Sequence, residues 1–371
     1  MKLPVHPLAG ELSQSVPAPS DPRPIIALGA GNIVREAHIP AYRATGIPYA
    51  GFFDIDSARA RATRDIAGEG EVFVDLAAAI GTAQTLGALG DRVVFDIAVP
   101  AEQILSLVSA LPVGSAALIQ KPLGRNLAEA EEIAAVCEAR SIVASVNFQL
   151  RSAPAMLALH DAISRGLLGT PTECEFRVNL FTPWGRWAFL EGIPRMEILY
   201  HSIHYLDLVR HLFGDPTAIR GVSHRDSSLP NHADTRTTLI CDGPPGLRTL
   251  VHTNHAHDFG RRHGASELRV EGTDGAAVVR MGVNLDYPRG AADSLEISER
   301  EGDWHRVPLR GNWFPAAFEG PMALLQRFLA GEGEEPWTQI TDAVRTMALV
   351  EAAYSACTTP GTPIPGTGQA R

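Results

Sequence analysis

The chain has 371 residues, of which 45% are apolar and 20% are charged. At about 150 residues per domain this length predicts two or three domains, and the composition is typical of a folded protein rather than a disordered or fibrous one. The formal net charge is −10, from 32 Lys and Arg against 42 Asp and Glu residues. Because no local basic run offsets it, we expect neither a nucleic-acid nor a membrane partner.

The four cysteines argue against a disulfide framework. They lie far apart in sequence, without a Cys-x-x-Cys pair, at Cys137, Cys174, Cys241 and Cys357. The sequence also lacks a run of about 18 apolar residues and an apolar segment of the signal-peptide type. We therefore expect a cytoplasmic protein with reduced thiols.

The first half of the chain alternates short apolar runs with helical patterns. Residues 1–24 contain six prolines, so we expect a flexible tail there. The alternation that follows predicts a doubly wound parallel sheet, a Rossmann dinucleotide-binding domain, over residues 25–148. Its strands are expected at Ile25–Leu28, Tyr49–Phe53, Val93–Ala98, Ala116–Ile119 and Ser141–Asn147, and its helices at Val34–Thr45, Ser57–Ala67, from Glu102 and at Leu127–Arg140.

After Arg151 helices are followed by strands in series, which predicts an α+β domain with a largely antiparallel, open sheet. We assign residues 149–340 to this domain, 341–358 to a C-terminal helix with Thr341 and Asp342 at its start, and 359–371 to a second tail. The expected elements are helices at Pro154–Arg165, Glu197–Phe213 and Ala316–Ala330, and strands at Thr237–Cys241, Arg248–His255, Glu267–Glu271 and Ala276–Arg280.

The turn Gly29–Val34 stands where a dinucleotide-binding fingerprint is expected. Gly29 permits a tight turn and Gly31 lets a pyrophosphate approach the backbone, although Val34 replaces the third small residue. Asp54 ends the second strand, where its carboxylate can accept from the ribose hydroxyls. The alternative is a fortuitous glycine turn beside a solvent-facing aspartate.

The carboxylate of Asp54 would repel a 2′-phosphate, so the pattern favours NAD over NADP. Arg59 and Arg61 could offset that repulsion, but we expect both on the exposed face of the next helix. The residues expected to contact the cofactor are Gly29, Gly31, Asn32, Ile33, Asp54, Pro100 and Lys121.

Two further groups suggest a reacting centre. Lys121 directly follows a strand, at the carboxyl edge of the sheet, where it can hydrogen-bond a substrate hydroxyl; the alternative is a solvated lysine. Tyr200, His204, Asp207 and His211 recur at spacings of four, three and four, which places them along one side of a helix ending at Gly214. Burying such a stripe is unfavourable unless each group is paired, which favours a site.

A second set of polar and aromatic residues is expected around the substrate. Strand alternation would place His255 and His257 on one face, but without an acidic or cysteine ligand at a suitable spacing we expect pocket contacts rather than a metal site. Trp184 and Trp187 suit the CH faces of a sugar ring and Arg186 its hydroxyls; packing alone is the alternative for each tryptophan.

From about Ile25 to Cys357 the chain resembles the glucose-fructose oxidoreductase/inositol dehydrogenase (Gfo/Idh/MocA) family. The resemblance rests on the order and spacing of several motifs: the turn at Gly29, His38-Ile39-Pro40, Asp54, Gln120-Lys121-Pro122, and His204-Tyr-Leu-Asp207. It implies an NAD(P)-dependent dehydrogenase or reductase of sugars and cyclitols, with a Rossmann domain and an oligomer-forming sheet domain.

By position the resemblance makes Lys121 and His204 the catalytic pair. The family's aspartate four residues before that histidine is here Tyr200, and Gln120 replaces a glutamate. The residues expected to bind substrate are Tyr200, His201, Gln149, Arg151, Trp184, Arg186, Trp187 and His255.

We therefore expect an NAD-dependent oxidoreductase acting on a sugar or related polyol, in a homodimer or homotetramer formed through the open sheet face. Within enzymes the alternative is redox-assisted elimination or hydrolysis of a glycoside. The alternative from another class is a non-catalytic NAD-binding sugar sensor, suggested by Tyr200 and Gln120, whereas retention of Lys121 and His204 speaks against it.

Overall fold

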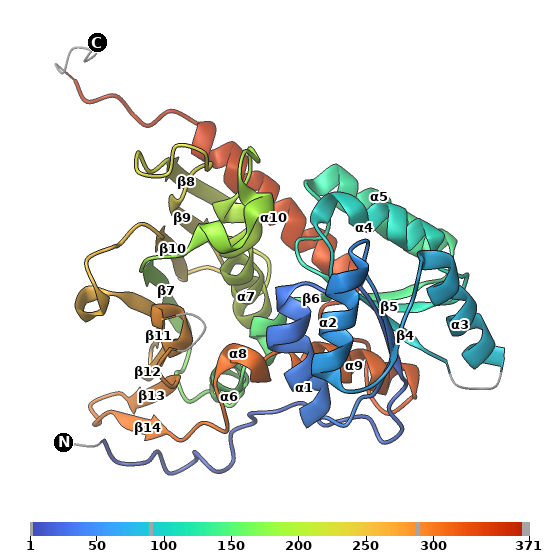
Figure 1. Cartoon of the computed structure of the whole chain (residues 1–371). Helices are drawn as coiled ribbons and strands as arrows, with labels where there is room; N and C mark the ends of the chain where they lie inside the picture. The colour runs from blue at the N-terminus through green and yellow to red at the C-terminus, as the bar shows by residue number, and fades with distance from the viewer. Residues whose placement is uncertain (1–2, 89–91, 287–289, 366–371) are drawn as a thin grey trace.

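The computed structural model describes residues 3–88, 92–286 and 290–365. The parts of the two expected tails at residues 1–2 and 366–371 lie outside the described residues. Two sheets dominate the molecule and stand side by side, with helices α7 (Ile203–Phe213) and α10 (Ile340–Thr358) between them (Figure 1).

The N-terminal sheet is parallel throughout and has the strand order β3-β2-β1-β4-β5-β6. Its central strands are buried along their whole length because helices cover both faces. The predicted doubly wound sheet is confirmed. Its strands are β1 (Ile25–Leu28), β2 (Tyr49–Phe53), β3 (Glu71–Val72), β4 (Val94–Ile97), β5 (Ala116–Gln120) and β6 (Val143–Asn147). Its helices are η1 (Val34–His38), α1 (Ile39–Ala44), α2 (Ser57–Ala67), α3 (Leu76–Ala88), α4 (Ala101–Ala110) and α5 (Leu127–Ala139).

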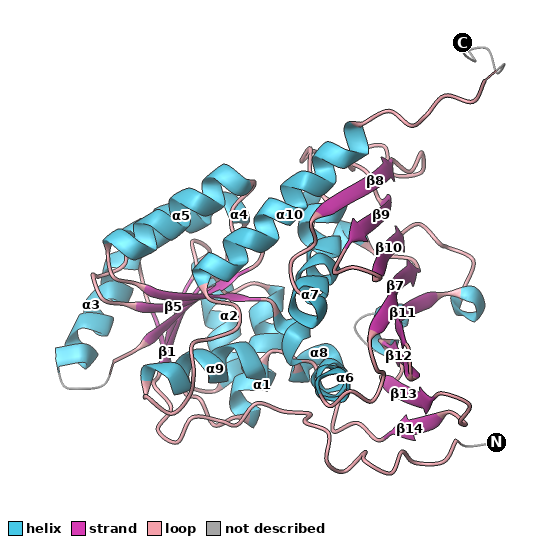
Figure 2. Cartoon of the chain, turned by 180° about the vertical axis from the view of Figure 1, so that it is seen from behind, coloured by secondary structure: helices cyan, strands magenta, loops and turns pink. Residues whose placement is uncertain are grey.

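The second sheet has the order β14-β13-β12-β11-β7-β10-β9-β8, and every pairing is antiparallel except that of β7 with β10. The predicted, largely antiparallel sheet is confirmed. Helices α6 (Pro154–Ser164), α7 and α10 lie on the side of this sheet that faces the Rossmann domain (Figure 2). The strands are β7 (Pro171–Asn179), β8 (Ala218–His224), β9 (Arg236–Asp242), β10 (Arg248–Asn254), β11 (Ala265–Gly272), β12 (Gly275–Arg280), β13 (Ser294–Glu299) and β14 (His305–Val307).

Short helical segments complete the chain. They are η2 (Gln149–Ser152), η3 (Trp184–Arg186), η4 (Ala188–Leu190), η5 (Ile198–Ser202), η6 (Arg261–His263), η7 (Gly282–Asp286), α8 (Trp313–Ala316) and α9 (Glu319–Leu329). Helix α9 packs on β5 and β6, so a segment that we assigned to the second domain covers the Rossmann sheet. Among the described residues, no helix is both long and apolar enough to cross a membrane.

The N-terminal segment is not the free tail that its prolines suggested. Val5 forms a bridge with Arg306 of β14, and Leu12 is buried. Further along, the backbone N–H of Ser13 donates to Asp161 on α6, and Arg23 donates to the carbonyl of Leu329 on α9. Prolines prevent regular structure here, but the few apolar side chains still find a surface on which to pack.

The start of the last helix also differs from the prediction. Helix α10 begins after Gln339, and no side chain caps it. The Asp342 carboxylate instead forms ion pairs with Arg151 and Arg210, at 2.7 and 2.9 Å. Asp342 thus lies in the first turn of α10, as predicted, but Thr341 does not cap the helix, and the carboxylate of Asp342 pairs with arginines from other segments.

Candidate active site

A cavity of about 710 Å³ opens at the carboxyl edge of the parallel sheet and extends to helix α7 of the second domain. Its walls include all of the expected cofactor contacts and most of the expected substrate contacts. These residues are Gly29, Gly31, Asn32, Ile33, Asp54, Pro100, Lys121, Gln149, Trp184, Arg186, Trp187, Tyr200, His201 and His204. Arg151 and His255 do not line it. The fold thus brings both groups of residues to one space.

The glycine turn at one end of the cavity has the geometry of a phosphate-binding turn. Gly29 has a φ of 98°, and a Cβ there would collide with the carbonyl oxygen of Ala98. A Cβ on Gly31, by contrast, would meet no atom within 4 Å. The first glycine is therefore required by the turn itself, whereas the second leaves open space beside the backbone.

Asp54 is held against this turn by the backbone. Its Oδ2 accepts a hydrogen bond from the N–H of Ala30 at 2.9 Å, and its Oδ1 accepts from the N–H of Asp56 at 2.9 Å. Arg59, which we expected on an exposed face, also lines the cavity and lies 3.2 Å from Oδ1 of Asp54. Arg61 instead donates to Ser57 on its own helix. The negative charge of Asp54 is thus partly balanced by one arginine.

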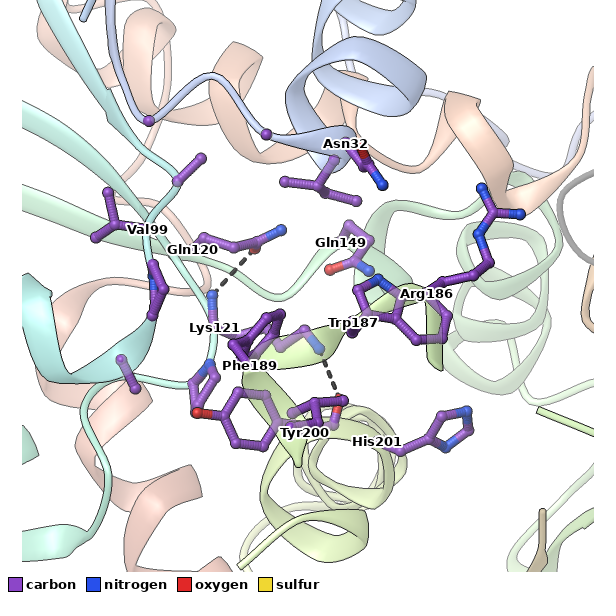
Figure 3. A pocket seen from close by; sticks show the side chains of 18 of the residues that line it. Asn32, Val99, Gln120, Lys121, Gln149, Arg186, Trp187, Phe189, Tyr200 and His201 are labelled. Carbon is purple, nitrogen blue, oxygen red and sulfur yellow. Dashed lines mark hydrogen bonds between the residues drawn. The ribbon is translucent and has the colours of Figure 1, made fainter. Parts of the chain in front are cut away.

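Lys121 projects from the end of β5 towards α7. Its Nζ donates a hydrogen bond to the carbonyl of Tyr200 at 2.7 Å, as Figure 3 shows, and its own N–H donates to the side chain of Gln120. Burial lowers the pKa of Lys121 from 10.5 to about 8. This ammonium group therefore loses its proton much more readily than an exposed lysine.

His204 lines the cavity together with Lys121. Burial, and then the nearby charge of Lys121, hold the pKa of His204 well below its usual value. Its Nδ1 is buried and has no hydrogen-bond partner among the described residues. A neutral imidazole with a free nitrogen is a suitable proton acceptor.

The predicted helical stripe divides into two parts. A π-helical turn, η5, precedes α7, and such turns are frequent at functional sites. Tyr200 and His204 line the cavity, whereas Asp207 and His211 face other partners. The His211 ring stacks on His160 with 4.7 Å between centroids. Only the N-terminal half of the stripe belongs to the site.

Arg151 does not occupy the position that we expected. Its side chain is 4% exposed, and its Nε and Nη2 donate to Asp207 and Asp342, both at 2.7 Å. Two carboxylates from α7 and α10 thus hold the guanidinium away from the cavity. Arg151 thus connects these two helices and does not line the cavity, and its expected contact with substrate stays a prediction.

His255 is also displaced from its expected position. Strand β10 ends at Asn254, so His255 and His257 lie beyond the strand, and strand alternation does not place them on one face. His255 is fully buried, with Nδ1 2.7 Å from Oγ1 of Thr182 and Nε2 3.2 Å from Oε1 of Glu197. Its ring lies 4.1 Å from that of His201, which lines the cavity whereas His255 does not, so the expected contact of His255 with substrate stays a prediction.

Aromatic side chains close the outer part of the cavity. Trp184 is buried and lies edge-on to Trp187, with 6.2 Å between ring centroids. Phe189, which we did not single out, packs on Tyr200. Arg186 reaches across to Glu36 of the Rossmann domain at 3.1 Å. Figure 3 shows Trp187, Phe189 and Tyr200 around the same space as Lys121. The two tryptophans could be singled out from the sequence. The contact between Arg186 and Glu36 could not, because these residues are far apart in the chain.

Comparisons with known proteins agree with this arrangement. A D-apiose dehydrogenase of Paraburkholderia graminis is 30% identical over 346 residues, 88% of this chain and 85% of that protein. A 1,5-anhydro-D-fructose reductase of Ensifer adhaerens is 25% identical, over 90% of this chain and 95% of that protein.

A solved structure and a family model match as well. An oxidoreductase from Agrobacterium radiobacter, crystallised with NAD+, L-tartaric acid and magnesium, is similar in fold with a TM-score of 0.71. It is 23% identical, and the match covers 91% of this chain and 96% of that one. Residues 156–278 match the model of the GFO/IDH/MocA C-terminal domain. The chain belongs to the Gfo/Idh/MocA family of oxidoreductases.

Proposed function

We propose that the protein is an NAD-dependent oxidoreductase that transfers a hydride to or from a hydroxyl-bearing carbon of a sugar, cyclitol or related polyol. The observation that carries this proposal is that Lys121 and His204 line the same cavity as the turn at Gly29. When NAD is bound, its nicotinamide ring supplies the hydride acceptor or donor. The chain itself must then orient the substrate and move one proton.

His204 is the group that exchanges this proton. In the direction of oxidation the C–H bond gives up a hydride, and the hydroxyl proton passes to His204, whose pKa is low enough for the imidazole to be neutral beforehand. Lys121 donates a hydrogen bond to the same substrate oxygen and stabilises the negative charge that develops there. In the direction of reduction the neutral His204 first takes a proton from solvent and then passes it to that oxygen as the hydride reaches the carbon.

The turn at Gly29 fits a dinucleotide. The backbone beside Gly31 is open to the cavity, and the Asp54 carboxylate lies at the end of β2, where it can accept from ribose hydroxyls. The same carboxylate repels a 2′-phosphate, which supports NAD. Arg59 attracts a phosphate, but its ion pair with Asp54 reduces that attraction.

The walls of the substrate half support a carbohydrate-like substrate. Trp184, Trp187 and Phe189 offer flat apolar surfaces to the CH faces of a ring, and Gln149 and His201 offer hydrogen-bonding groups. The sugar-named relatives, a D-apiose dehydrogenase and an anhydrofructose reductase, point to the same substrate class.

The experiment that tests the proposal is NADH absorbance with a panel of aldoses, cyclitols and sugar acids. We expect turnover on at least one of them, with NAD much preferred over NADP. Tyr200→Phe is an informative variant, because a large loss of rate would mean that the tyrosine hydroxyl has replaced the family aspartate. Binding of NAD and sugar without any turnover would contradict the proposal and indicate a sensor.

A further inference from the structure

A compact cluster of three potential metal ligands lies directly behind the substrate half of the cavity. Glu197 precedes η5, His201 belongs to η5, and His255 follows β10. One ligand atom of each residue lies within 4.8 Å of the others. Because Glu197 is distant in sequence from His255, no local spacing identified this group.

The cluster is buried on one side and open on the other. His255 Nε2 and His201 Nδ1 lie 3.2 and 4.0 Å from Oε1 of Glu197, and the two imidazole rings are 4.1 Å apart between centroids. Glu197 and His255 are almost completely buried, whereas His201 reaches the cavity wall. In Figure 3 the His201 ring points away from Lys121 and Tyr200.

In the described part of the chain, Glu197 forms ion pairs with two histidines, and neither Lys nor Arg is among its partners. Its Oε1 also accepts a hydrogen bond from Ser202. Its Oε2 and the Nδ1 of His201 are buried, and neither atom has a hydrogen-bond partner among the residues that the structure describes. A buried carboxylate is unfavourable unless a cation or several donors compensate it. The cluster therefore carries one negative charge, and two of its nitrogen and oxygen atoms are available to bind a metal ion.

Neighbouring side chains already hold the ligands in place. Oγ1 of Thr182 lies 2.7 Å from Nδ1 of His255, which directs Nε2 towards Glu197, and Ser202 donates to Oε1 of Glu197 at 2.6 Å. Such outer hydrogen bonds orient the ligands of metal sites.

We propose that Glu197, His201 and His255 bind one divalent transition-metal ion, with zinc as the best match, and that its remaining coordination position faces the cavity. Zinc is often bound by two imidazoles and one carboxylate in sites whose fourth coordination position is occupied by water or a substrate oxygen. This site would correct the expectation that the protein binds no metal.

Zinc content after chelation and reloading tests the site. The full-length protein is treated with a chelator, incubated with zinc, desalted and analysed by mass spectrometry for bound metal. We expect about one zinc per chain in the wild type and loss of that zinc in His201→Ala and Glu197→Gln. His252→Ala is the matched control, because this histidine of β10 pairs with Thr238 outside the cluster and should retain zinc binding.

Two further measurements keep the test decisive if a ligand variant folds poorly, which circular dichroism will show. Thr182→Val removes only the outer hydrogen bond to His255 and should weaken zinc binding by about 10- to 100-fold. Cobalt added to the wild-type protein should give visible absorption bands typical of nitrogen and oxygen ligands in a site of low coordination number.

Absence of bound zinc in the wild type would overturn the proposal. Equal zinc content in the wild type, His201→Ala and Glu197→Gln would do the same, because the metal would then lie elsewhere. All of these measurements are made without NAD or substrate. The zinc proposal can therefore be refuted while hydride transfer is observed, and it can be supported while hydride transfer is not observed.

Discussion

The buried ammonium group of Lys121 predicts a specific dependence of stability on pH. Its pKa is about 8 in the folded protein, against 10.5 for an exposed lysine. Between these two values the unfolded chain binds more protons than the folded one, so the stability gained from this group rises as pH increases. At about 1.4 kcal/mol per pKa unit, the full change is about 3 kcal/mol.

Lys121→Met isolates this contribution, because methionine occupies similar space without a titrating group. The wild type should gain about 3 kcal/mol of unfolding free energy relative to the variant between about pH 7 and pH 10.5. Urea unfolding of both proteins at several pH values measures this difference. If the difference between the two proteins did not change with pH, Lys121 would not be desolvated and its proposed role beside His204 would lose its basis.

The remaining predictions concern the reaction, the cofactor, the interior and the assembly. His204→Ala should lower kcat by about 10²- to 10⁴-fold with NAD affinity nearly unchanged, measured by steady-state kinetics and titration; near-normal turnover would refute its role. Asp54→Ala should reduce the preference for NAD over NADP, and equal affinities in the wild type would contradict the assignment of Asp54. Arg151→Met should reduce stability to urea by about 3–5 kcal/mol, because it removes the arginine paired with the buried carboxylate of Asp207 while Asp342 keeps Arg210, but should not change KM in the folded protein. Light scattering should give a dimer or tetramer mass, and a monomer at micromolar concentration would count against burial of the open sheet face.

The sequence alone predicted the features that depend on short stretches of chain. The strand, turn and helix around Gly29 are adjacent in sequence, and the requirement for a positive φ is local. Parallel strands in a doubly wound sheet all end at one edge, so the strand pattern by itself places Asp54 and Lys121 at the same edge. The helix repeat likewise predicts Tyr200 and His204 on one side, and both line the cavity although Tyr200 lies in a π-helical turn.

Strand β7 shows where local patterns were insufficient. It occupies the centre of the second sheet, and its buried residues Cys174, Phe176 and Val178 alternate with the charged residues Glu173, Glu175 and Arg177. This alternation is the pattern of a half-buried strand, but by itself it does not show where in a sheet the strand lies. Its place in the sheet depends on β10 and β11, which lie more than sixty residues away in the chain.

Only the tertiary structure decided which charged and polar residues face the cavity. Arg151 is adjacent to the site in sequence, but Asp207 and Asp342 hold it in the interior because a buried charge must be paired. His255 turns inward to Glu197 for the same reason. Pairing of this kind joins residues from distant parts of the chain. It depends on which helices and strands lie next to one another, and a local sequence pattern does not predict that.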